Sequence, residues 1–402
     1  MTTFYPPYHF GGDATYVRSL SRALVEKGHE VEVVHCEDAW RTVSHSQAPA
    51  EVMSDDAIGV HRLKSRFGIL SSVITQQTGR PGLKHAALKK ILDRSFDVVH
   101  FHNISLVGGP AVLRLSKAPV TLYSLHEHWL LCPTHIFWKN RTHACDVKQC
   151  LRCSLRSGIP PQLWRYTGLI RRSLAGVDAM LAPSDFTARK HEEAGIGQNI
   201  QVLPLFSTLD PGEPPDFSPA QNPKFLYVGR VTASKGLLPL LETFARLGEA
   251  DLQVVGDGEM LPRLQQDFAS AKNIAFLGSV RQSELVRLYQ RATALILPSL
   301  APETFGLTVA EAFACATPAI VRAAGGSREL VDATGAGFVY ETNDELQQRV
   351  RQLVADHALR IELGKKAREG YISLYTAARH LDQYLSTIAT IQRRKGVKLH
   401  RA

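Results

Sequence analysis

Short apolar runs alternate with longer amphipathic stretches along most of this 402-residue chain. Compact apolar runs bounded by turn residues are typical of strands buried in parallel sheets, and the stretches between them have the period of a helix. The alternation therefore predicts βαβ units and an α/β fold. The predicted strands are Val31–His35, Val98–His102, Val120–Leu125, Ala179–Ala182, Ile200–Leu203, Phe225–Val228, Leu252–Val255, Ile274–Leu277, Ala294–Leu297, Ala319–Val321 and Gly337–Tyr340.

A proline-rich segment separates the chain into two halves. Six prolines fall between Pro204 and Pro223, and such a segment cannot form a central strand or helix. The strand pattern resumes at Phe225, so we expect two doubly wound parallel-sheet domains, whose ligands bind beyond the carboxyl ends of the strands. The expected parts are residues 1–206 with a Cys-rich insertion near 132–153, a linker at 207–223, a second domain at 224–380, and a C-terminal helix and basic tail at 381–402.

Composition and charge narrow the class of protein. Apolar residues make up 44% of the chain and charged residues 21%, which excludes a disordered or fibrous protein. No run of 18 apolar residues predicts a membrane-spanning helix, and residues 1–10 carry no secretory signal, so we expect a cytoplasmic protein. The net charge of +9 favours anionic partners: nucleic acid, phosphate-bearing metabolites or anionic lipid.

Cations and glycines follow the first strands of the second half. Arg230 comes directly after one predicted strand and Lys235 lies at the start of the next helix, an arrangement suited to clamping a diphosphate. Gly256-Asp-Gly258 follows the next strand, although a glycine pair alone predicts no more than a tight turn.

Two carboxylates, Glu303 and Glu311, follow the strand that ends near Pro298. Gly306 and Leu307 begin a helix between them, where free backbone amides and the helix dipole attract phosphate. The carboxylates can accept hydrogen bonds from sugar hydroxyls, and we expect both to be ionised because neighbouring cations favour the charged form. Paired carboxylates also occur in glycosidases, but that alternative leaves the cations and glycines unexplained.

These motifs together resemble the retaining glycosyltransferases of family 4, which have the GT-B fold of two Rossmann-like domains facing a cleft. The resemblance extends over most of the chain. One departure is Ala316, where the family usually has Gly. The matching motifs are V-G-R-x4-K-G (228–236), V-G-D-G (255–258), F-L-G-x-V (276–280), P-S-x3-E-x-F-G-L-x3-E-A (298–312), Gly325-Gly326 and Glu329.

The resemblance implies roles for the matching positions. Arg230 and Lys235 would neutralise the donor diphosphate and assist its departure, and Glu303 would hold donor-sugar hydroxyls. Glu311 would hold the ribose hydroxyls, while Gly306 and Leu307 would present amides to phosphate. Val280 and its loop would line the base pocket, and Gly256 would be among the donor-binding residues.

The first half offers a second group of candidates. Gly11-Gly12-Asp13 precedes a predicted helix at Ala14–Lys27, so the glycines bring backbone close to a ligand, or Asp13 caps the helix. His102 and His126 follow neighbouring predicted strands. In the family a His-Asp pair, with its histidine near the donor sugar, occupies the place of His126-Glu127. Ser184 matches a family serine and is equally suited to cap a helix.

The beginning of the chain departs from the family pattern. The family opens with an apolar strand, of which Met1-Thr-Thr-Phe-Tyr5 offers at most the last residues. We therefore expect translation to begin upstream of Met1.

Four of the six cysteines, Cys132, Cys145, Cys150 and Cys153, fall within 22 residues. The spacing and a reducing cytoplasm favour either a structural zinc site or unligated thiols over disulfides. A catalytic metal is not expected, because the chain has no D-x-D motif and the resemblance implies metal-independent transfer.

Basic and aromatic residues mark the expected acceptor side, in the first domain. Residues 62–90, together with Trp164-Arg-Tyr166 and Arg171-Arg172, would either meet an anionic inner membrane surface carrying a lipid-linked acceptor or form solvated helix faces. The resemblance implies a UDP- or GDP-sugar donor, a sugar or lipid-linked hydroxyl acceptor, and no nucleic acid. Cell-surface polysaccharide or glycolipid synthesis is the usual setting. The alternatives are a nucleotide-sugar 2-epimerase and a non-catalytic nucleotide-sugar-binding protein.

Overall fold

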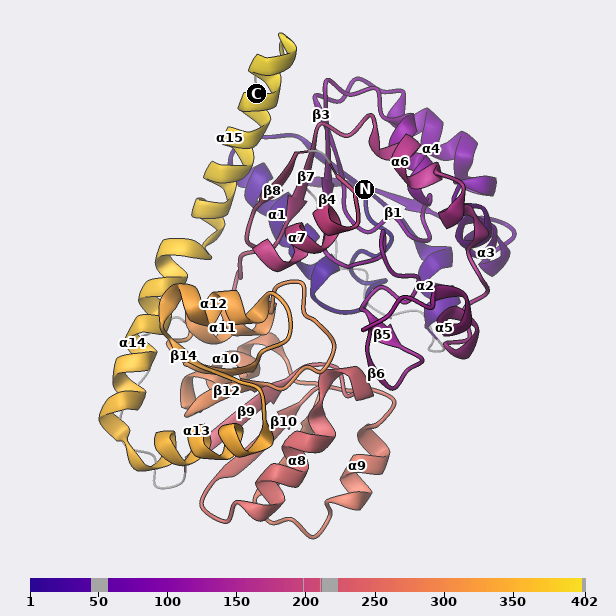
Figure 1. The fold of residues 1–402 in the computed structure, drawn as a ribbon. Helices are drawn as coiled ribbons and strands as arrows, with labels where there is room; N and C mark the ends of the chain where they lie inside the picture. Colours follow the sequence, from indigo (N-terminus) through magenta and orange to yellow (C-terminus); the bar gives the residue numbers. More distant parts are fainter. Residues whose placement is uncertain (45–56, 198, 210, 212–222, 400–402) are drawn as a thin grey trace. The chain divides into compact units, whose positions relative to one another are not determined.

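A computed structural model describes residues 1–44, 57–197, 199–209, 211 and 223–399, in two compact units (Figure 1). The first unit comprises Met1–His135, Gln149–Leu203 and His380–Ala402; the second comprises Ile136–Lys148 and Pro204–Arg379. The units change at Leu203, three residues before the expected end of the first domain. The predicted linker at 207–223 lies mostly outside the described residues.

The second unit is built on a six-stranded parallel sheet in the order β11-β10-β9-β12-β13-β14. All six predicted strands are confirmed to within one residue at each end. The strands are β9 (Lys224–Val228), β10 (Asp251–Val255), β11 (Ile274–Gly278), β12 (Ala294–Leu297), β13 (Ala319–Arg322) and β14 (Gly337–Tyr340). The helices are α8 (Leu237–Arg246), α9 (Leu261–Asp267), α10 (Gln282–Arg291), α11 (Leu307–Ala314), α12 (Ser327–Thr334), α13 (Asn343–Ala355) and α14 (His357–Leu374).

Both faces of this sheet are buried, which explains why its strands are continuous apolar runs. Successive residues of one strand enter different cores: Leu295 belongs to one cluster with Phe313, while Ile296 belongs to the other with Phe244. The helices on both sides therefore hold the strand ends in place, and with them the loops that carry the candidate site.

The first unit has a parallel sheet in two parts, β1-β2 and β3-β4-β7-β8. Met1–Thr3 lie between the parts: Thr2 N donates to Val34 O of β1, and His102 N, directly after β3, donates to Met1 O, both at 2.9 Å. These residues thus take the place of a central strand. The strands are β1 (Val31–Cys36), β2 (Ile58–Leu63), β3 (Val98–Phe101), β4 (Val120–Ser124), β7 (Ala179–Ala182) and β8 (Ile200–Val202).

Helices of the first unit follow the predicted pattern, beginning with α1 (Gly12–Glu26) in place of the expected Ala14–Lys27. The others are α2 (Glu37–Val43), α3 (Ile69–Thr78), α4 (His85–Leu92), α5 (Cys150–Arg156), α6 (Leu169–Leu174) and α7 (Asp185–Glu193), with 3₁₀ turns η1 (Gly82–Lys84), η2 (Pro110–Leu115) and η3 (Leu163–Tyr166). A short hairpin, β5 (Trp138–Lys139) and β6 (His143–Ala144), belongs to the second unit. A further 3₁₀ turn, η4 (Ala233–Lys235), precedes α8.

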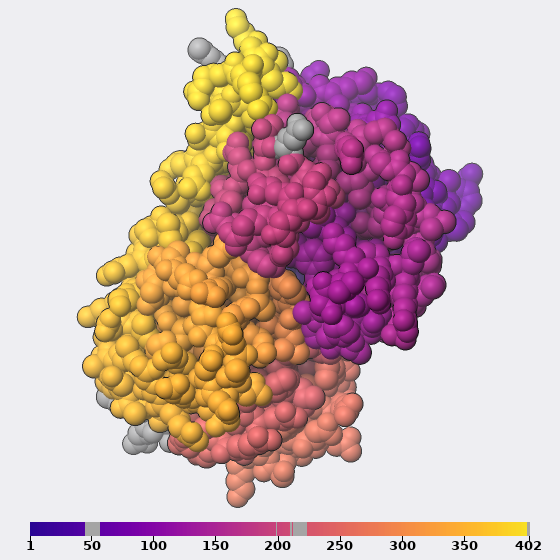
Figure 2. All heavy atoms as spheres, viewed as in Figure 1, coloured from indigo at the N-terminus to yellow at the C-terminus, as the bar shows by residue number. Residues whose placement is uncertain are grey.

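The C-terminal helix α15 (Ala377–Lys395) returns the chain to the first unit. Tyr384, Ile388 and Ile391 pack on strand residues of β4 and β7, and Figure 2 shows the yellow C-terminal residues against magenta residues of this unit. Lys395 pairs with Asp178 Oδ1 at 2.9 Å and donates to Pro119 O at 2.6 Å. The expected separate tail is therefore part of the first unit.

Candidate functional site

The candidate site of the second unit lies where the strand order reverses. β9 and β12 are neighbours in the sheet, although β10 and β11 separate them in sequence. Arg230 and Lys235 follow β9, whereas Glu303, Gly306 and Glu311 follow β12. A doubly wound sheet opens a crevice at this reversal, beyond the carboxyl ends of its strands. The fold thus brings the two predicted groups of residues to one edge.

Glycines let the loops at this edge pass very close to each other. Gly256 has φ 133°, and a Cβ atom there would lie 1.9 Å from Gly229 O. Gly236 has φ 70°, and its Cβ would lie 2.1 Å from Pro298 O. Only glycine permits such approaches, so the loops after β9, β10 and β12 form one interlocked surface.

Lys235 and Glu303 form the ionic centre of the site. Lys235 Nζ lies 2.6 Å from Glu303 Oε1, and Ser299 Oγ donates a hydrogen bond to the same oxygen. Although burial raises the pKa of Glu303, the ammonium and the hydroxyl outweigh it, and the pKa falls below its ordinary value. The expectation of an ionised Glu303 is confirmed.

The backbone of Glu303 is held as firmly as its side chain. Its N–H donates to Ala324 O at 3.1 Å, and its carbonyl accepts from Gly326 N at 2.7 Å. A Cβ atom at Gly325 (φ 86°) would lie 2.3 Å from Glu303 O. The Gly325-Gly326 pair of the family pattern therefore positions Glu303.

Glu311 has a different environment, and it is only partly ionised at neutral pH rather than fully ionised as expected. Burial raises the pKa of Glu311 to about 7. The hydrogen bond that Tyr289 Oη donates to Glu311 Oε2, at 2.9 Å, lowers the pKa but does not outweigh the burial. Lys235 is engaged by Glu303, so the cation expected to keep Glu311 charged is directed elsewhere. Glu311 therefore changes its charge near neutral pH.

Gly306 and Leu307 begin α11 as predicted. Gly306 is the N-cap, in a left-handed conformation (φ 104°), and no side chain caps the helix. A Cβ atom there would lie 2.9 Å from Ser327 Cβ. As a glycine, the N-cap has no side chain to occupy the first amides of α11, and these amides and the helix dipole favour an anion. Val280, on the loop after β11, packs against the core of this unit.

In the first unit, His102 and His126 lie together. Nδ1 of His102 is 2.8 Å from Nε2 of His126, and the rings stack with 5.1 Å between centroids. Burial lowers the pKa of His126 to about 3 and that of His102 well below its ordinary value. Both imidazoles are therefore neutral at physiological pH. Gly11 (φ 71°) is the N-cap of α1, so Asp13 lies within the first turn and does not cap the helix.

Five further residues surround this pair and had no sequence signal of their own. His100 Nε2 is 2.8 Å from Ser124 Oγ, and its Nδ1 is 3.1 Å from Tyr384 Oη of α15. The hydroxyl of Tyr16, on α1, is 2.8 Å from Nε2 of His380. The Tyr16 ring packs edge-on against His126. A histidine that follows a strand by itself gives no indication of these distant partners.

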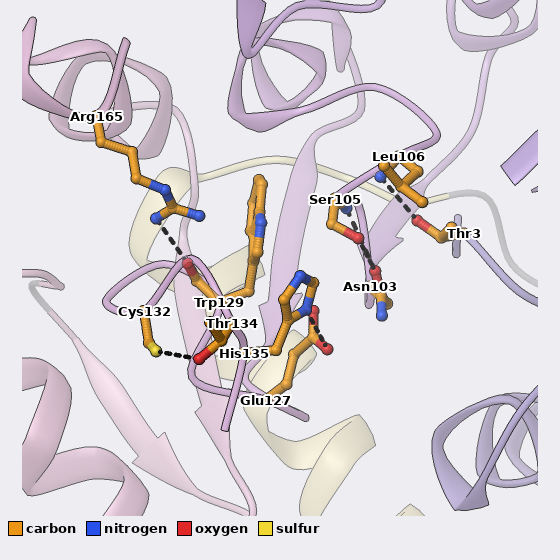
Figure 3. A network of polar contacts seen from close by, with 10 residues as sticks. All are labelled: Thr3, Asn103, Ser105, Leu106, Glu127, Trp129, Cys132, Thr134, His135 and Arg165. Atoms are coloured by element: carbon orange, nitrogen blue, oxygen red, sulfur yellow. Dashed lines mark hydrogen bonds and ion pairs between the residues drawn. The ribbon is translucent and has the colours of Figure 1, made fainter. Parts of the chain in front are cut away.

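Glu127 and Ser184 each contact residues close to them in sequence, and Figure 3 shows the contact of Glu127. Glu127 Oε2 lies 2.8 Å from His135 Nδ1, so this residue pairs with the loop that follows it. Ser184 caps α7 by accepting a hydrogen bond from Thr187 N. The capping alternative for Ser184 is confirmed.

The structural zinc site expected at the four clustered cysteines stays a prediction. Within the described parts of the chain, no three His, Cys, Asp or Glu residues are grouped to hold an ion. None of these four cysteines is in a disulfide. In Figure 3 Cys132 instead contacts Thr134, with 3.2 Å between Sγ and Oγ1.

The basic acceptor-side segment is partly internal. Lys84 is buried, and its ammonium donates to Ser71 O at 2.9 Å and Thr75 Oγ1 at 2.9 Å. Lys84 therefore cannot meet a bilayer. Within the described ranges, no helix has the length and apolar character needed to cross a membrane.

Two family models match the chain in succession. Glycosyltransferase Family 4 matches residues 10–206, and Glycosyl transferases group 1 matches residues 214–370. Among curated relatives, a D-inositol 3-phosphate glycosyltransferase of Pseudarthrobacter chlorophenolicus is 27% identical over 89% of this chain and 85% of its own.

Solved structures share the fold. Sucrose-phosphate synthase from Thermosynechococcus elongatus has a TM-score of 0.72 at 20% identity and covers 94% of both chains. HepE of Anabaena, solved in complex with UDP, has a TM-score of 0.67 at 15% identity, over 97% of this chain and all of its own. With the two family models matched in series and the parallel sheets described above, the chain belongs to the group 1, family 4 glycosyltransferases and has the GT-B fold.

Proposed function

We propose that this protein transfers a sugar from a nucleoside diphosphate sugar to a hydroxyl acceptor with retention at the anomeric carbon. The observation that carries the proposal is the convergence of Arg230, Lys235, Glu303, Glu311 and the glycine-capped N-terminus of α11 at the strand-order reversal. Cations and free amides suit a diphosphate, and two carboxylates suit the hydroxyls of a sugar and a ribose.

Each residue has a separate task in this proposal. Arg230 and Lys235 take the developing charge of the diphosphate, with the amides of Gly306 and Leu307. Glu303, released from Lys235 when phosphate engages the ammonium, accepts hydrogen bonds from the donor sugar. Glu311, in its ionised form, accepts them from the ribose.

The step we propose breaks the bond between the anomeric carbon and the diphosphate oxygen. The acceptor oxygen attacks the same face of the sugar, and its proton passes to the departing diphosphate oxygen. His126, neutral and held by His102, is proposed to orient the donor sugar. Cations and helix dipole supply the electrostatic stabilisation, so the proposed transfer needs no metal ion.

We propose UDP as the nucleotide, ahead of GDP. The support is the solved relative with bound UDP, whose fold matches this chain over nearly its whole length. The proposed setting is cytoplasmic synthesis of a cell-surface polysaccharide or glycolipid, with an acceptor on the inner face of the membrane.

The test is a thermal-shift series with UDP-, GDP-, ADP- and dTDP-sugars in the presence of EDTA. At 100 times its dissociation constant, a true donor stabilises the folded chain by about 2.7 kcal/mol. Arg230→Ala abolishes the shift, while Arg263→Ala, an exposed arginine on α9, keeps it. Absence of a shift with every donor contradicts the proposal. Incubation with the stabilising donor and acceptors then separates a transferase from a 2-epimerase, which isomerises the donor, and from a binding protein, which leaves it intact.

A further inference from the structure

The α3–α5–η3 surface of the first unit exposes large apolar side chains. We define it by Ile69 and Leu70 of α3, Leu151 and Leu155 of α5, and Leu163 and Tyr166 of η3. These side chains are between 46% and 65% exposed. Scattered apolar residues are normal on a protein surface, whereas a cluster on neighbouring elements marks an interaction site.

The three elements are joined to each other. Trp164 Nε1 of η3 donates to Gln76 O of α3 at 2.8 Å. Leu151 and Arg152 of α5 line one surface hollow together with Tyr166 of η3. Trp164 is buried and Arg165 turns inward to donate to Trp129 O, so Leu163 and Tyr166 are the residues of η3 that face outward.

Helix α3 has its polar side inward. Ser71, Ser72 and Thr75 are its buried residues, and Ser71 and Thr75 bind the internal ammonium of Lys84. Ile69 and Leu70 lie on the exposed side. A surface helix of a globular protein normally has the opposite arrangement, so the exposed apolar side of α3 is not a by-product of core packing.

The chain segments that form this surface contain no acidic residue. Residues 57–92 hold seven Lys and Arg, and residues 149–177 hold five, with no Asp or Glu in either range. The whole chain has 38 acidic residues, so their complete absence from both segments is a marked bias. Arg66, Arg152 and Arg156 are exposed beside the apolar side chains. The surface thus combines insertion of apolar groups with attraction to anions.

We propose that the α3–α5–η3 surface docks on an anionic lipid bilayer. Leucine, isoleucine and tyrosine side chains enter the interface to the depth of one side chain, while the arginines contact lipid phosphates. Docking on a second copy of the chain would bring two cationic surfaces together, which electrostatic repulsion disfavours. A nucleic acid would leave the aliphatic side chains in water. The proposal deepens the proposed function, since it would place the transferase where an amphiphilic acceptor resides, but docking itself does not depend on catalysis.

The experiment is co-sedimentation of the full chain with vesicles of phosphatidylcholine alone or mixed with phosphatidylglycerol at a 60:40 ratio. We expect strong binding to the mixed vesicles and little to phosphatidylcholine. Leu151→Ser/Leu155→Ser/Leu163→Ser is expected to weaken binding at least tenfold. The control Ile372→Ser/Leu374→Ser, which changes exposed apolar residues of α14, is expected to bind like the wild type.

The cations are tested in the same way. Arg66→Gln/Arg152→Gln/Arg156→Gln is expected to weaken binding about 100-fold, because each arginine contributes about 1 kcal/mol of attraction to anionic head groups. Arg263→Gln/Arg328→Gln/Lys366→Gln removes the same charge from the second unit, where each cation pairs with an exposed carboxylate, and should have little effect.

Several results would overturn the proposal. Equal binding by the leucine variant and the wild type, or no binding to either vesicle, excludes docking through this surface. A dimer in light scattering that the leucine variant dissociates assigns the surface to a second copy, and retention of RNA that the arginine variant loses assigns it to nucleic acid. The donor-induced thermal shift of the variants distinguishes this failure from failure of the proposed function, because docking variants keep the donor site.

Discussion

Nδ1 of His102 lies 2.8 Å from Nε2 of His126, at the ends of two adjacent strands. Because burial keeps both rings neutral, one nitrogen of this pair donates and the other accepts. The contact therefore couples the tautomers of the two rings and sets the orientation of the His126 ring. His102 is a positioning residue for the proposed role of His126.

Replacing His102 should lower turnover while leaving donor affinity unchanged. His102→Ala removes one hydrogen bond to His126, worth about 1 kcal/mol, so we expect kcat to fall about five- to tenfold. His102→Asn, whose amide can restore the contact, should recover much of the loss. The check is kcat at saturating donor between pH 5 and 8. If His126 is neutral throughout, the wild type shows no His126 titration in that range. Equal activity of His102→Ala and the wild type would remove the positioning role.

Lys235 should be required both for the donor and for the charge of Glu303. Lys235→Met leaves Glu303 buried without its ammonium partner, so the pKa of Glu303 rises and the nucleotide loses a phosphate contact. We expect loss of the donor-induced thermal shift. Lys366→Met, which breaks an exposed pair with Glu362, is the matched control and should retain the shift. A retained shift in Lys235→Met would assign the diphosphate to other groups.

Glu311 should make donor affinity depend on pH near neutrality. In the proposed site a ribose hydroxyl donates to the carboxylate, so donor binding favours the ionised form, and a pKa of about 7 predicts roughly tenfold weaker donor binding at pH 6 than at pH 8. Titration calorimetry at both pH values measures the ratio. Glu311→Gln should bind weakly at both, with no pH dependence.

The raised pKa of Glu311 also predicts how the free energy of unfolding changes with pH. The folded pKa of about 7 lies above the unfolded value, so the folded state holds more protons between about pH 4.5 and pH 7. Stability from this group is fully present below that window and is lost as the pH rises through it, by about 3 kcal/mol at most. Urea unfolding of the wild type and Glu311→Gln at pH 5 and pH 8 checks it. The variant should gain relative stability at pH 8, and a constant difference between the two proteins would contradict the raised pKa.

Ala316 offers a stabilising substitution. It follows α11 with φ 56°, a left-handed conformation that costs an alanine more than a glycine. Ala316→Gly should therefore raise the free energy of unfolding by about 0.5–1 kcal/mol, without changing donor affinity. Denaturant unfolding measures the difference, and a destabilised variant would mean that packing of the buried methyl outweighs the backbone strain.

Local sequence patterns predict most of the strands and site residues of the second unit. Strand periodicity located β9 to β14 to within a residue, and the parallel arrangement predicts Arg230, Lys235, Glu303 and Glu311 at one edge of the sheet. The reason is that a parallel sheet buried on both faces requires continuous apolar strands with polar loops at their carboxyl ends. Helix start signals such as Gly306 and Ser184 are equally local.

Other features depended on partners far away in the chain. Tyr16 meets His380 across 364 positions, and His100 meets Tyr384 across 284, so no local pattern could reveal this cluster. The burial of the Lys84 ammonium against α3 and the pKa of Glu311 likewise depend on which neighbours the folded chain supplies. The sequence by itself determined the order of elements and the residue types at the strand ends, because periodicity and turn chemistry act over a few residues. Only the tertiary structure decided which groups are buried, paired or charged, because desolvation and electrostatic interactions act through space between distant parts of the chain.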